Sequence, residues 1–360
     1  MNIFNVNADI SRAETLSSRF YTGDEYFHES KEKIFARSWQ LVGCNTDVRN
    51  LKPYTILENF LDEPILITRN NAEFRCLSNV CTHRGKILVE EPCQANLIRC
   101  GYHGRRFSLD GKFLSMPEFE GVENFPCGTD NLTQVSLKTR GGFMFASIDP
   151  ADAFEAFVDD APMLGTTEPE GLRLTSNREY EVNAHWALYC ENYLEGFHIP
   201  YVHRGLNEVV DYGRYTTDIF RYSSVQTAQS EPEAVGKEFL DKAALKPPSC
   251  SDKHIAARYL FIFPNLMFNF YPWGVSVNVV RPVSPSKSVI EFVTYVRDES
   301  LMAEGAGADL HGVEMEDEAV VESVQKGVRS RFYNSGRYSP TREQGTHHFH
   351  RLIGEFMRKC

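Results

Sequence analysis

Two short segments of the sequence each place a cysteine just ahead of a histidine. The first reads CTHRG over residues 81–85, and the second reads CGYHG over residues 100–104. Thiolates and imidazoles are common ligands of transition metals, so this repeated pairing indicates a metal centre. The four candidate ligands are Cys81, His83, Cys100 and His103.

The order of these ligands separates two kinds of metal site. Structural zinc sites of the Cys2His2 type usually take both cysteines from one segment and both histidines from another, whereas here each segment supplies one of each. The order suits a [2Fe-2S] cluster with two cysteines on one iron and two histidines on the other. Imidazole ligands raise the potential of such a cluster, which can then receive electrons and pass them on. Zinc is the less favoured alternative.

A second motif, ENYLEGFHIPYVH over residues 191–203, combines carboxylates with two imidazoles. On a helix its polar residues would share one face, and such a face usually meets water. Pro200 breaks or kinks a helix, so His203 can turn back toward His198. The residues expected on the shared face are Glu191, Asn192, Glu195 and His198.

A third candidate ligand lies far along the chain, in a helix expected over residues 313–328. Valines recur there at helical spacing, and Asp317 falls in the middle of their stripe, whereas Glu316 and Glu318 lie off it. A carboxylate on a buried face must be paired. Asp317 therefore either binds a metal or pairs with an arginine.

Two groups of elements must position these side chains. Residues 39–150 contain short strands around hairpin signals such as Asn70-Asn71 and Asp110-Gly111, which predicts a small all-β domain. Residues 1–38 and 151–360 mix helices with longer strands, which predicts an α+β domain with an antiparallel sheet. We expect helices at 22–35 (after a capping box at Thr22–Glu25), 153–158 and 185–198, and strands at 172–182, 257–263, 275–281 and 288–297. Residues 205–255 have weak periodicity.

Composition narrows the class of protein. A net charge of -11 over 360 residues argues against nucleic acid as a partner. No apolar run is long enough to span a bilayer, and the N-terminus lacks the features of a signal peptide, so we expect no membrane partner and a cytoplasmic location. The odd number of cysteines, nine, favours free thiols. No Gly-x-Gly-x-x-Gly fingerprint follows a strand, so nicotinamide and flavin must bind a separate protein.

Together these motifs closely resemble the Rieske non-heme iron oxygenases, whose α subunits share this layout over nearly the full length. The resemblance implies a Rieske [2Fe-2S] domain at 39–150 and a helix-grip catalytic domain. It also implies that His198, His203 and Asp317 hold a mononuclear Fe(II), because the family places an acid–Asp pair eight residues before a glutamine, here Gln325. The family's second segment typically reads Cys-Pro-Tyr-His-Gly-Trp. Gly101 and Arg105 replace its proline and tryptophan, which predicts a different partner-facing surface.

The resemblance also implies how electrons arrive. In this family a flavin and iron–sulfur reductase, in some systems with a ferredoxin, passes electrons from NAD(P)H to the cluster. They then cross to the iron of a neighbouring subunit in a ring-shaped trimer. A carboxylate between two metal-bound histidines carries that contact. It is usually an aspartate, and Glu195 holds the matching position here.

The substrate is the least specified feature. The segment at 192–203 is most similar to the choline monooxygenase group, which predicts O2-dependent hydroxylation or N-demethylation of a small quaternary or tertiary amine such as choline, a betaine or carnitine. Asn192, Tyr271 and Trp273 are the candidate substrate contacts, because aromatic cages bind quaternary ammonium ions. Alternating aromatics at 261–273 can equally fill a sheet's core. The alternatives are an aromatic-ring-hydroxylating dioxygenase and, more distantly, a non-catalytic electron-transfer protein.

Overall fold

The computed structural model describes residues 3–158, 163–164, 171–230, 255–303 and 305–359. The chain divides into two compact units, one of Ala36–Ala151 and one that combines Met1–Phe35 with Asp152–Cys360. No helix in the described ranges is both long and apolar enough to cross a membrane.

The unit Ala36–Ala151 is built from short antiparallel strands, as predicted. Six of them form a sheet in the order β1-β9-β8-β4-β3-β2, and three more form a small sheet in the order β5-β6-β7. The hairpin predicted at Asn70-Asn71 is confirmed, since Asn70 pairs with Glu73. The strands are β1 Gln40–Cys44, β2 Leu51–Ile56, β3 Glu63–Asn70, β4 Glu73–Ser78, β5 Ile98–Arg99, β6 Arg106–Phe107, β7 Phe113–Ser115, β8 Gln134–Arg140 and β9 Phe143–Ser147.

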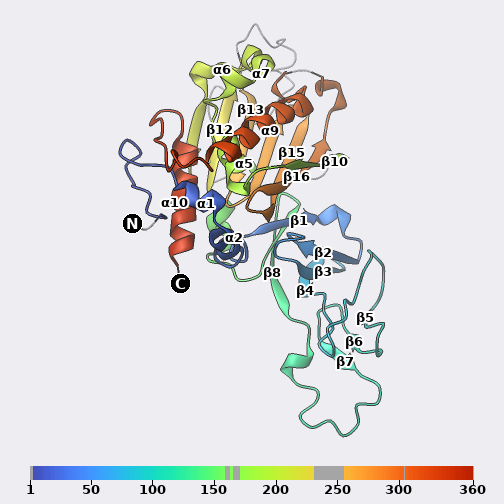
Figure 1. Ribbon diagram of the computed structural model, residues 1–360. Coiled ribbons are helices and arrows are strands. Elements are labelled where there is room, and N and C mark those ends of the chain that lie inside the picture. Colours follow the sequence, from blue (N-terminus) through green and yellow to red (C-terminus); the bar gives the residue numbers. More distant parts are fainter. Residues whose placement is uncertain (1–2, 159–162, 165–170, 231–254, 304, 360) are drawn as a thin grey trace. The chain divides into compact units, whose positions relative to one another are not determined.

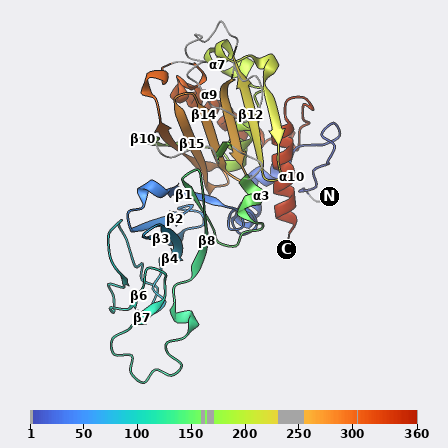
Figure 2. The same cartoon turned by 180° about the vertical axis from the view of Figure 1, so that it is seen from behind.

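The second unit contains a seven-stranded antiparallel sheet in the order β10-β16-β15-β14-β13-β12-β11. Its α5 and α9 helices lie against one face of that sheet (Figures 1 and 2). The strands are β10 Arg173–Val182, β11 Thr216–Ile219, β12 Ser223–Gln229, β13 Ile255–Ile262, β14 Leu266–Tyr271, β15 Gly274–Ser284 and β16 Lys287–Val296. The helices are α1 Ser18–Thr22, α2 Asp24–Ser30, α3 Phe154–Val158, α5 Trp186–Tyr193, α6 Ile199–Val202, α7 Arg204–Val209, α9 Leu310–Gly327 and α10 Gln344–Arg358.

The register of this sheet decides which side chains face the helices. Tyr259 on β13 pairs with Asn269 on β14, and Asn269 pairs with Ser276 on β15. Cross-strand partners and residues two positions along a strand share one face, so Tyr271 and Asn278 lie on the same side. Phe268 and Phe270 point to the opposite face, where aromatic packing fills the core.

One expectation about these elements is corrected, and the weakly periodic stretch is partly assigned. The capping box before α2 is absent, because Gly23 is the N-cap and the Thr22 hydroxyl donates to the Ser18 carbonyl instead. Strands β11 and β12 and helix α7 occupy part of the weakly periodic stretch 205–255. Residues 231–254 of that stretch, including Pro247-Pro248, lie outside the described residues.

Candidate functional site

The predicted continuous helix over residues 185–198 is wrong, and the break positions two histidines. Helix α5 ends at Tyr193, the chain turns, and α6 begins at Ile199 with His198 as its N-cap and His203 as its C-cap. Gly196 forms part of the turn, where a Cβ atom would lie only 2.8 Å from the ring of Tyr215. The two histidines therefore flank a single helical turn that contains Pro200.

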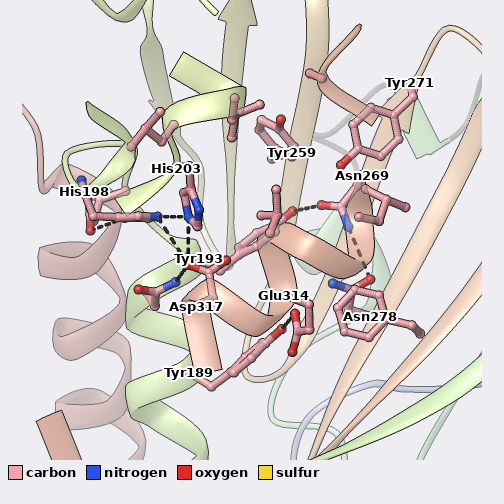
Figure 3. Close-up of a pocket in the computed structure, with 18 of the residues that line it drawn as sticks. Tyr189, Tyr193, His198, His203, Tyr259, Asn269, Tyr271, Asn278, Glu314 and Asp317 are labelled. Atoms are coloured by element: carbon pink, nitrogen blue, oxygen red, sulfur yellow. Dashed lines mark hydrogen bonds and ion pairs between the residues drawn. The ribbon is translucent and has the colours of Figure 1, made fainter. Parts of the chain in front are cut away.

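His198, His203 and Asp317 converge on one point (Figure 3). His203 Nε2 lies 3.2 Å from His198 Nε2 and 3.0 Å from Asp317 Oδ1, and His198 Nε2 lies 3.5 Å from the same carboxylate oxygen. Two imidazole nitrogens and one carboxylate oxygen facing one another form a donor set that suits a non-heme Fe(II) with open positions. The residues present therefore fit the implied metal.

A carboxylate holds the far nitrogen of each histidine. Glu195 lies 2.8 Å from His198 Nδ1 and also accepts the backbone N–H groups of Phe197 and His198. Glu316 lies 2.7 Å from His203 Nδ1. Such partners fix the tautomer of a metal-binding histidine, so that Nε2 faces the metal. Sequence reasoning missed the role of Glu316, although its place beside Asp317 was a usable signal.

The environment of His203 favours a charged imidazole while no metal is bound. Burial lowers the pKa of His203, but hydrogen bonds and charges from Asp317 and Glu316 outweigh that effect and raise it overall. Asn192 Nδ2 donates to Asp317 Oδ1 at 2.6 Å. Asn192 therefore orients the carboxylate in addition to lining the cavity beside it.

The valine stripe predicted around Asp317 is only partly correct. Val321 and Val328 are buried, but Val324 is 42% exposed. Glu314 and Gln325 occupy the buried face instead, and the Gln325 side chain accepts the backbone N–H of His185 at 2.8 Å. The buried side of α9 is thus mixed, because Glu314 borders a cavity and Gln325 binds backbone, while Val321 and Val328 remain apolar contacts.

A cavity of about 100 Å³ opens beside the three converging side chains. By the space that one buried water needs, this admits roughly seven to ten water-sized groups, which is the size of a small metabolite. Its walls are rich in tyrosine, and its described lining includes neither lysine nor arginine. The aromatic residues are Tyr189, Tyr193, Tyr215, Tyr259, Tyr271 and Phe292, and the carboxylates are Glu195, Glu314 and Asp317.

Two of the three predicted substrate contacts line this cavity. Asn192 and Tyr271 do so, whereas Trp273 does not and is fully buried behind Tyr271. The two rings stack with centroids 5.0 Å apart and planes 18° from parallel. Trp273 is therefore not a direct contact in the described cavity, because its ring is buried and packs on Tyr271 instead. Its indole supports the position of Tyr271.

A row of hydrogen-bonded side chains crosses the sheet at the cavity wall. The Tyr193 hydroxyl donates to Asn269 Oδ1 at 2.9 Å, and Asn269 Nδ2 donates to Asn278 Oδ1 at 3.3 Å. The Ser276 hydroxyl also donates to Asn278 Oδ1, at 3.2 Å. Sequence reasoning missed these amides because only the strand register brings them to one face.

In the unit Ala36–Ala151, two matched turns carry the cysteines and histidines. The backbone N–H of Cys81 donates to the Lys86 carbonyl, and that of Cys100 donates to the Arg105 carbonyl, each across five residues. Gly85 and Gly104 close these turns with φ of 71° and 74°, a conformation that glycine adopts without strain.

The turns bring like ligands together. The Cys81 and Cys100 thiols are buried and lie within hydrogen-bonding reach of each other. The His83 and His103 rings lie with centroids 4.8 Å apart. A pair of thiols facing a pair of imidazoles fits a [2Fe-2S] cluster with two ligands of each kind.

Arg105 does not reach the surface, contrary to the expectation that it alters the partner-facing surface. Its side chain is 2% exposed and forms an ion pair with Asp130. The guanidinium also lies over the rings of Phe107, Phe113 and Phe125 at 5.0–5.8 Å. In this chain a buried planar cation among aromatic faces thus stands at the motif position where the resembled family has tryptophan.

Comparison with known families agrees with both metal-binding arrangements. Residues 38–126 match the family model described as the Rieske [2Fe-2S] domain, and residues 169–359 match that of the ring hydroxylating alpha subunit (catalytic domain). The chain belongs to the ring-hydroxylating alpha-subunit family. Members are O2-dependent oxidoreductases that use a [2Fe-2S] cluster and a mononuclear iron, with electrons from a reductase. The catalytic domain excludes the electron-carrier alternative.

Relatives cover nearly the whole chain. The choline monooxygenase of Arabidopsis thaliana is 28% identical over 97% of this chain and 84% of its own length. The carnitine monooxygenase oxygenase subunit of Escherichia coli (strain K12) is 29% identical over 98% and 96%. A solved quaternary ammonium Rieske monooxygenase in complex with L-carnitine superposes with a TM-score of 0.75 at 25% identity, over 98% of this chain and 97% of that one. The similarity to these relatives therefore extends over nearly the whole of this chain.

Proposed function

We propose that this chain is the terminal oxygenase of a Rieske system that hydroxylates or N-demethylates a small quaternary or tertiary amine cation. The observation that carries the proposal is the tyrosine-walled, acidic cavity beside His198, His203 and Asp317. Aromatic faces attract an ammonium ion that cannot donate hydrogen bonds. Relatives that act on choline and carnitine support the same substrate class.

The chain's own residues have distinct roles in this proposal. His198, His203 and Asp317 hold the iron, and Cys81, His83, Cys100 and His103 hold the cluster in the domain at 39–150. Glu195 and Glu316 orient the histidines, Asn192 orients Asp317, and the tyrosines seat the cation and exclude water. When bound, the two metal centres supply the redox chemistry with O2, one electron coming from each.

The assembly is proposed on the family's pattern. Glu195 bridges to His83 or His103 of a neighbouring subunit in a homotrimer, and a flavin and iron–sulfur reductase, or a ferredoxin, supplies electrons from NAD(P)H. A cytoplasmic location suits this system, because none of the seven cysteines in the described ranges forms a disulfide.

Ring hydroxylation of an arene is the second candidate. Naphthalene 1,2-dioxygenase from Rhodococcus sp. shares the fold, with a TM-score of 0.75 at 16% identity over 95% of this chain and 94% of that one. The cavity wall argues against that reaction here, because a neutral arene offers no positive charge to Glu314 and no hydrogen-bonding group to the Asn278 amide.

Oxygen uptake with a surrogate reductase and NAD(P)H tests the proposal. The panel comprises choline, glycine betaine, L-carnitine and naphthalene. We expect substrate-dependent uptake with at least one amine, together with the oxidised amine or formaldehyde. A cis-diol from naphthalene with all amines inert would overturn the proposal.

A further inference from the structure

Glu314 is a buried carboxylate with an incomplete set of partners. Its side chain is 3% exposed and lines the cavity (Figure 3). One oxygen accepts the Tyr189 hydroxyl at 2.6 Å, and the only other side chain within hydrogen-bonding reach among the described residues is the acidic Glu318. Burial, with the charges of Asp317 and Glu318, raises the pKa of Glu314 well above its usual value, so its charged form lacks a cation. Burying a carboxylate without full compensation is costly, so such a group calls for a ligand that supplies the missing charge.

The carboxylates next to Glu314 on α9 add negative charge to its side of the cavity. Asp317 and Glu318 lie one turn away on α9, and no lysine or arginine occurs in the described lining. A bound molecule with a positive charge would be attracted by this cluster, and a bound carboxylate would be repelled. The cavity is thus selective by charge as well as by its tyrosine faces.

Helix α9 also sets the distance between the Glu314 carboxylate and the proposed iron ligand Asp317. Glu314 and Asp317 are three residues apart on α9, so their side chains lie side by side on one face. An ammonium group held at Glu314 therefore lies one helical turn from an iron ligand. Its methyl or methylene carbons are then the atoms closest to the metal site.

The far end of the ligand meets the amide wall. Asn278 Oδ1 accepts from Asn269 and Ser276, which leaves the Asn278 amide N–H groups with no acceptor among the described residues. A hydroxyl or carbonyl oxygen would complete this set. The single Asn278 carboxamide binds a carboxylate more weakly than an arginine would. It would therefore not compensate a ligand carboxylate so close to three acidic side chains.

From these observations we infer that Glu314 is the counter-ion of the substrate and makes the site selective for amine cations without a carboxylate, of the amino-alcohol type. The inference rests on the proposed function and narrows it. Choline is preferred over glycine betaine and L-carnitine, because their carboxylates would meet the acidic wall.

The test compares choline with its neutral carbon isostere, 3,3-dimethylbutan-1-ol, which has the same shape without the charge. Anaerobic calorimetry on the holoenzyme measures binding, so the readout is independent of turnover. We expect choline to bind the wild type about tenfold or more tightly than the isostere, because a buried charge pair is lost with the latter. The Glu314→Gln substitution keeps the shape and the Tyr189 contact. The substitution should bring the ratio of choline affinity to isostere affinity close to one, because it weakens the binding of choline alone.

Glu322→Gln is the matched control. It removes the same charge from the same helix but lies outside the cavity lining, and its amide oxygen can keep the contact with Asn183. Its choline-to-isostere ratio should equal that of the wild type. The Glu314 assignment is overturned if Glu314→Gln also keeps that ratio. Tighter binding of L-carnitine or glycine betaine than of choline would overturn the exclusion of carboxylates.

The outcomes also separate this inference from the proposed function. If amines are oxidised but the ratio does not depend on Glu314, only the counter-ion assignment fails. If no amine binds and an arene is oxidised, the proposed function fails with it.

Discussion

The two histidines of the proposed iron site differ in how they are held. Glu195 is largely buried and reaches both the His198 ring and two backbone N–H groups, so the turn that carries it is fixed from within. Glu316, the partner of His203, is half exposed. Substitution of the two carboxylates should therefore affect different steps.

Replacing Glu195 by glutamine should leave both metals bound but abolish most turnover, because the neutral amide does not reproduce the carboxylate contact between subunits. Iron and sulfide content and the cluster's visible spectrum measure whether both metal centres are retained. NADH-coupled product formation measures turnover. Glu195→Asp, which restores the family's usual residue, should retain more activity. Full activity of Glu195→Gln would refute the bridging role.

Replacing Glu316 by glutamine should weaken iron binding about 10- to 100-fold, since partners of this kind stabilise the metal-bound histidine. Iron retained after graded chelation, measured by atomic absorption, reports the change, and the cluster should be unaffected. Glu318→Gln, on the same helix without a histidine contact, is the control. Equal iron retention in both variants would show that Glu316 does not support His203.

Among the elements, a short turn helps to build the cavity. The 3-10 turn at Gly305–Gly307 contributes Ala306 to the lining and packs Gly307 against Tyr271 and Trp273. A Cβ atom on Gly307 would lie 2.9 Å from the ring of Tyr271 and would also meet Trp273 Nε1. The absence of a side chain at this glycine thus helps to set the position of a cavity residue.

Gly307→Ala should shift Tyr271, destabilise the fold by about 1–3 kcal/mol through overpacking, and weaken amine binding. Gly327→Ala is the matched control, because a Cβ there meets nothing within 4 Å. That substitution, at the end of α9, should be neutral or slightly stabilising. Thermal unfolding and calorimetry measure both effects, and unchanged amine affinity in Gly307→Ala would contradict the packing argument.

The start of α5 predicts a dependence of stability on pH. His185 is fully buried, its Nδ1 caps the helix by accepting the Ala187 N–H, and burial lowers its pKa to about 3. Below the ordinary pKa of about 6.5, the unfolded chain binds a proton that the folded chain does not, so stability falls as the pH drops from 6.5 toward 3. The expected loss at pH 5 is about 2 kcal/mol.

His185→Asn keeps a capping oxygen and removes this titration, so the difference in unfolding midpoint between pH 7.5 and pH 5 should shrink. His28→Asn, at an exposed position on α2, should leave that difference unchanged. An unchanged difference in His185→Asn would show that another group causes the acid sensitivity.

Local signals predicted the elements more reliably than their contacts. Hairpin residues predicted the turn between β3 and β4, and the spacing of CTHRG and CGYHG predicted two matched turns, because each signal depends on a few neighbouring residues. The end of α5 was not predictable in the same way, since packing of Tyr215 on Gly196 requires the fold. Tyr259, Asn269 and Asn278 reach the cavity through strand register, and Glu314 was hidden in a helix expected to bury valines.

At the scale of the whole molecule, two metal-binding units belong to one chain and serve one reaction. The proposed cluster ligands lie in Ala36–Ala151, and the proposed iron ligands come from two separate stretches of the other unit. Relatives of similar identity act on choline and on carnitine, so overall similarity alone does not choose between these substrates. The inference drawn from Glu314 makes that choice in favour of choline, through the acidic wall of the described cavity.

A single-turnover experiment tests whether this chain oxidises an amine cation rather than an arene, and it needs no reductase. Chemically reduced holoenzyme is exposed to O2 in the presence of choline and naphthalene together, and the products are quantified by mass spectrometry. We expect about one oxidised amine per iron and no oxidised arene. A naphthalene cis-diol with choline unchanged would contradict this expectation.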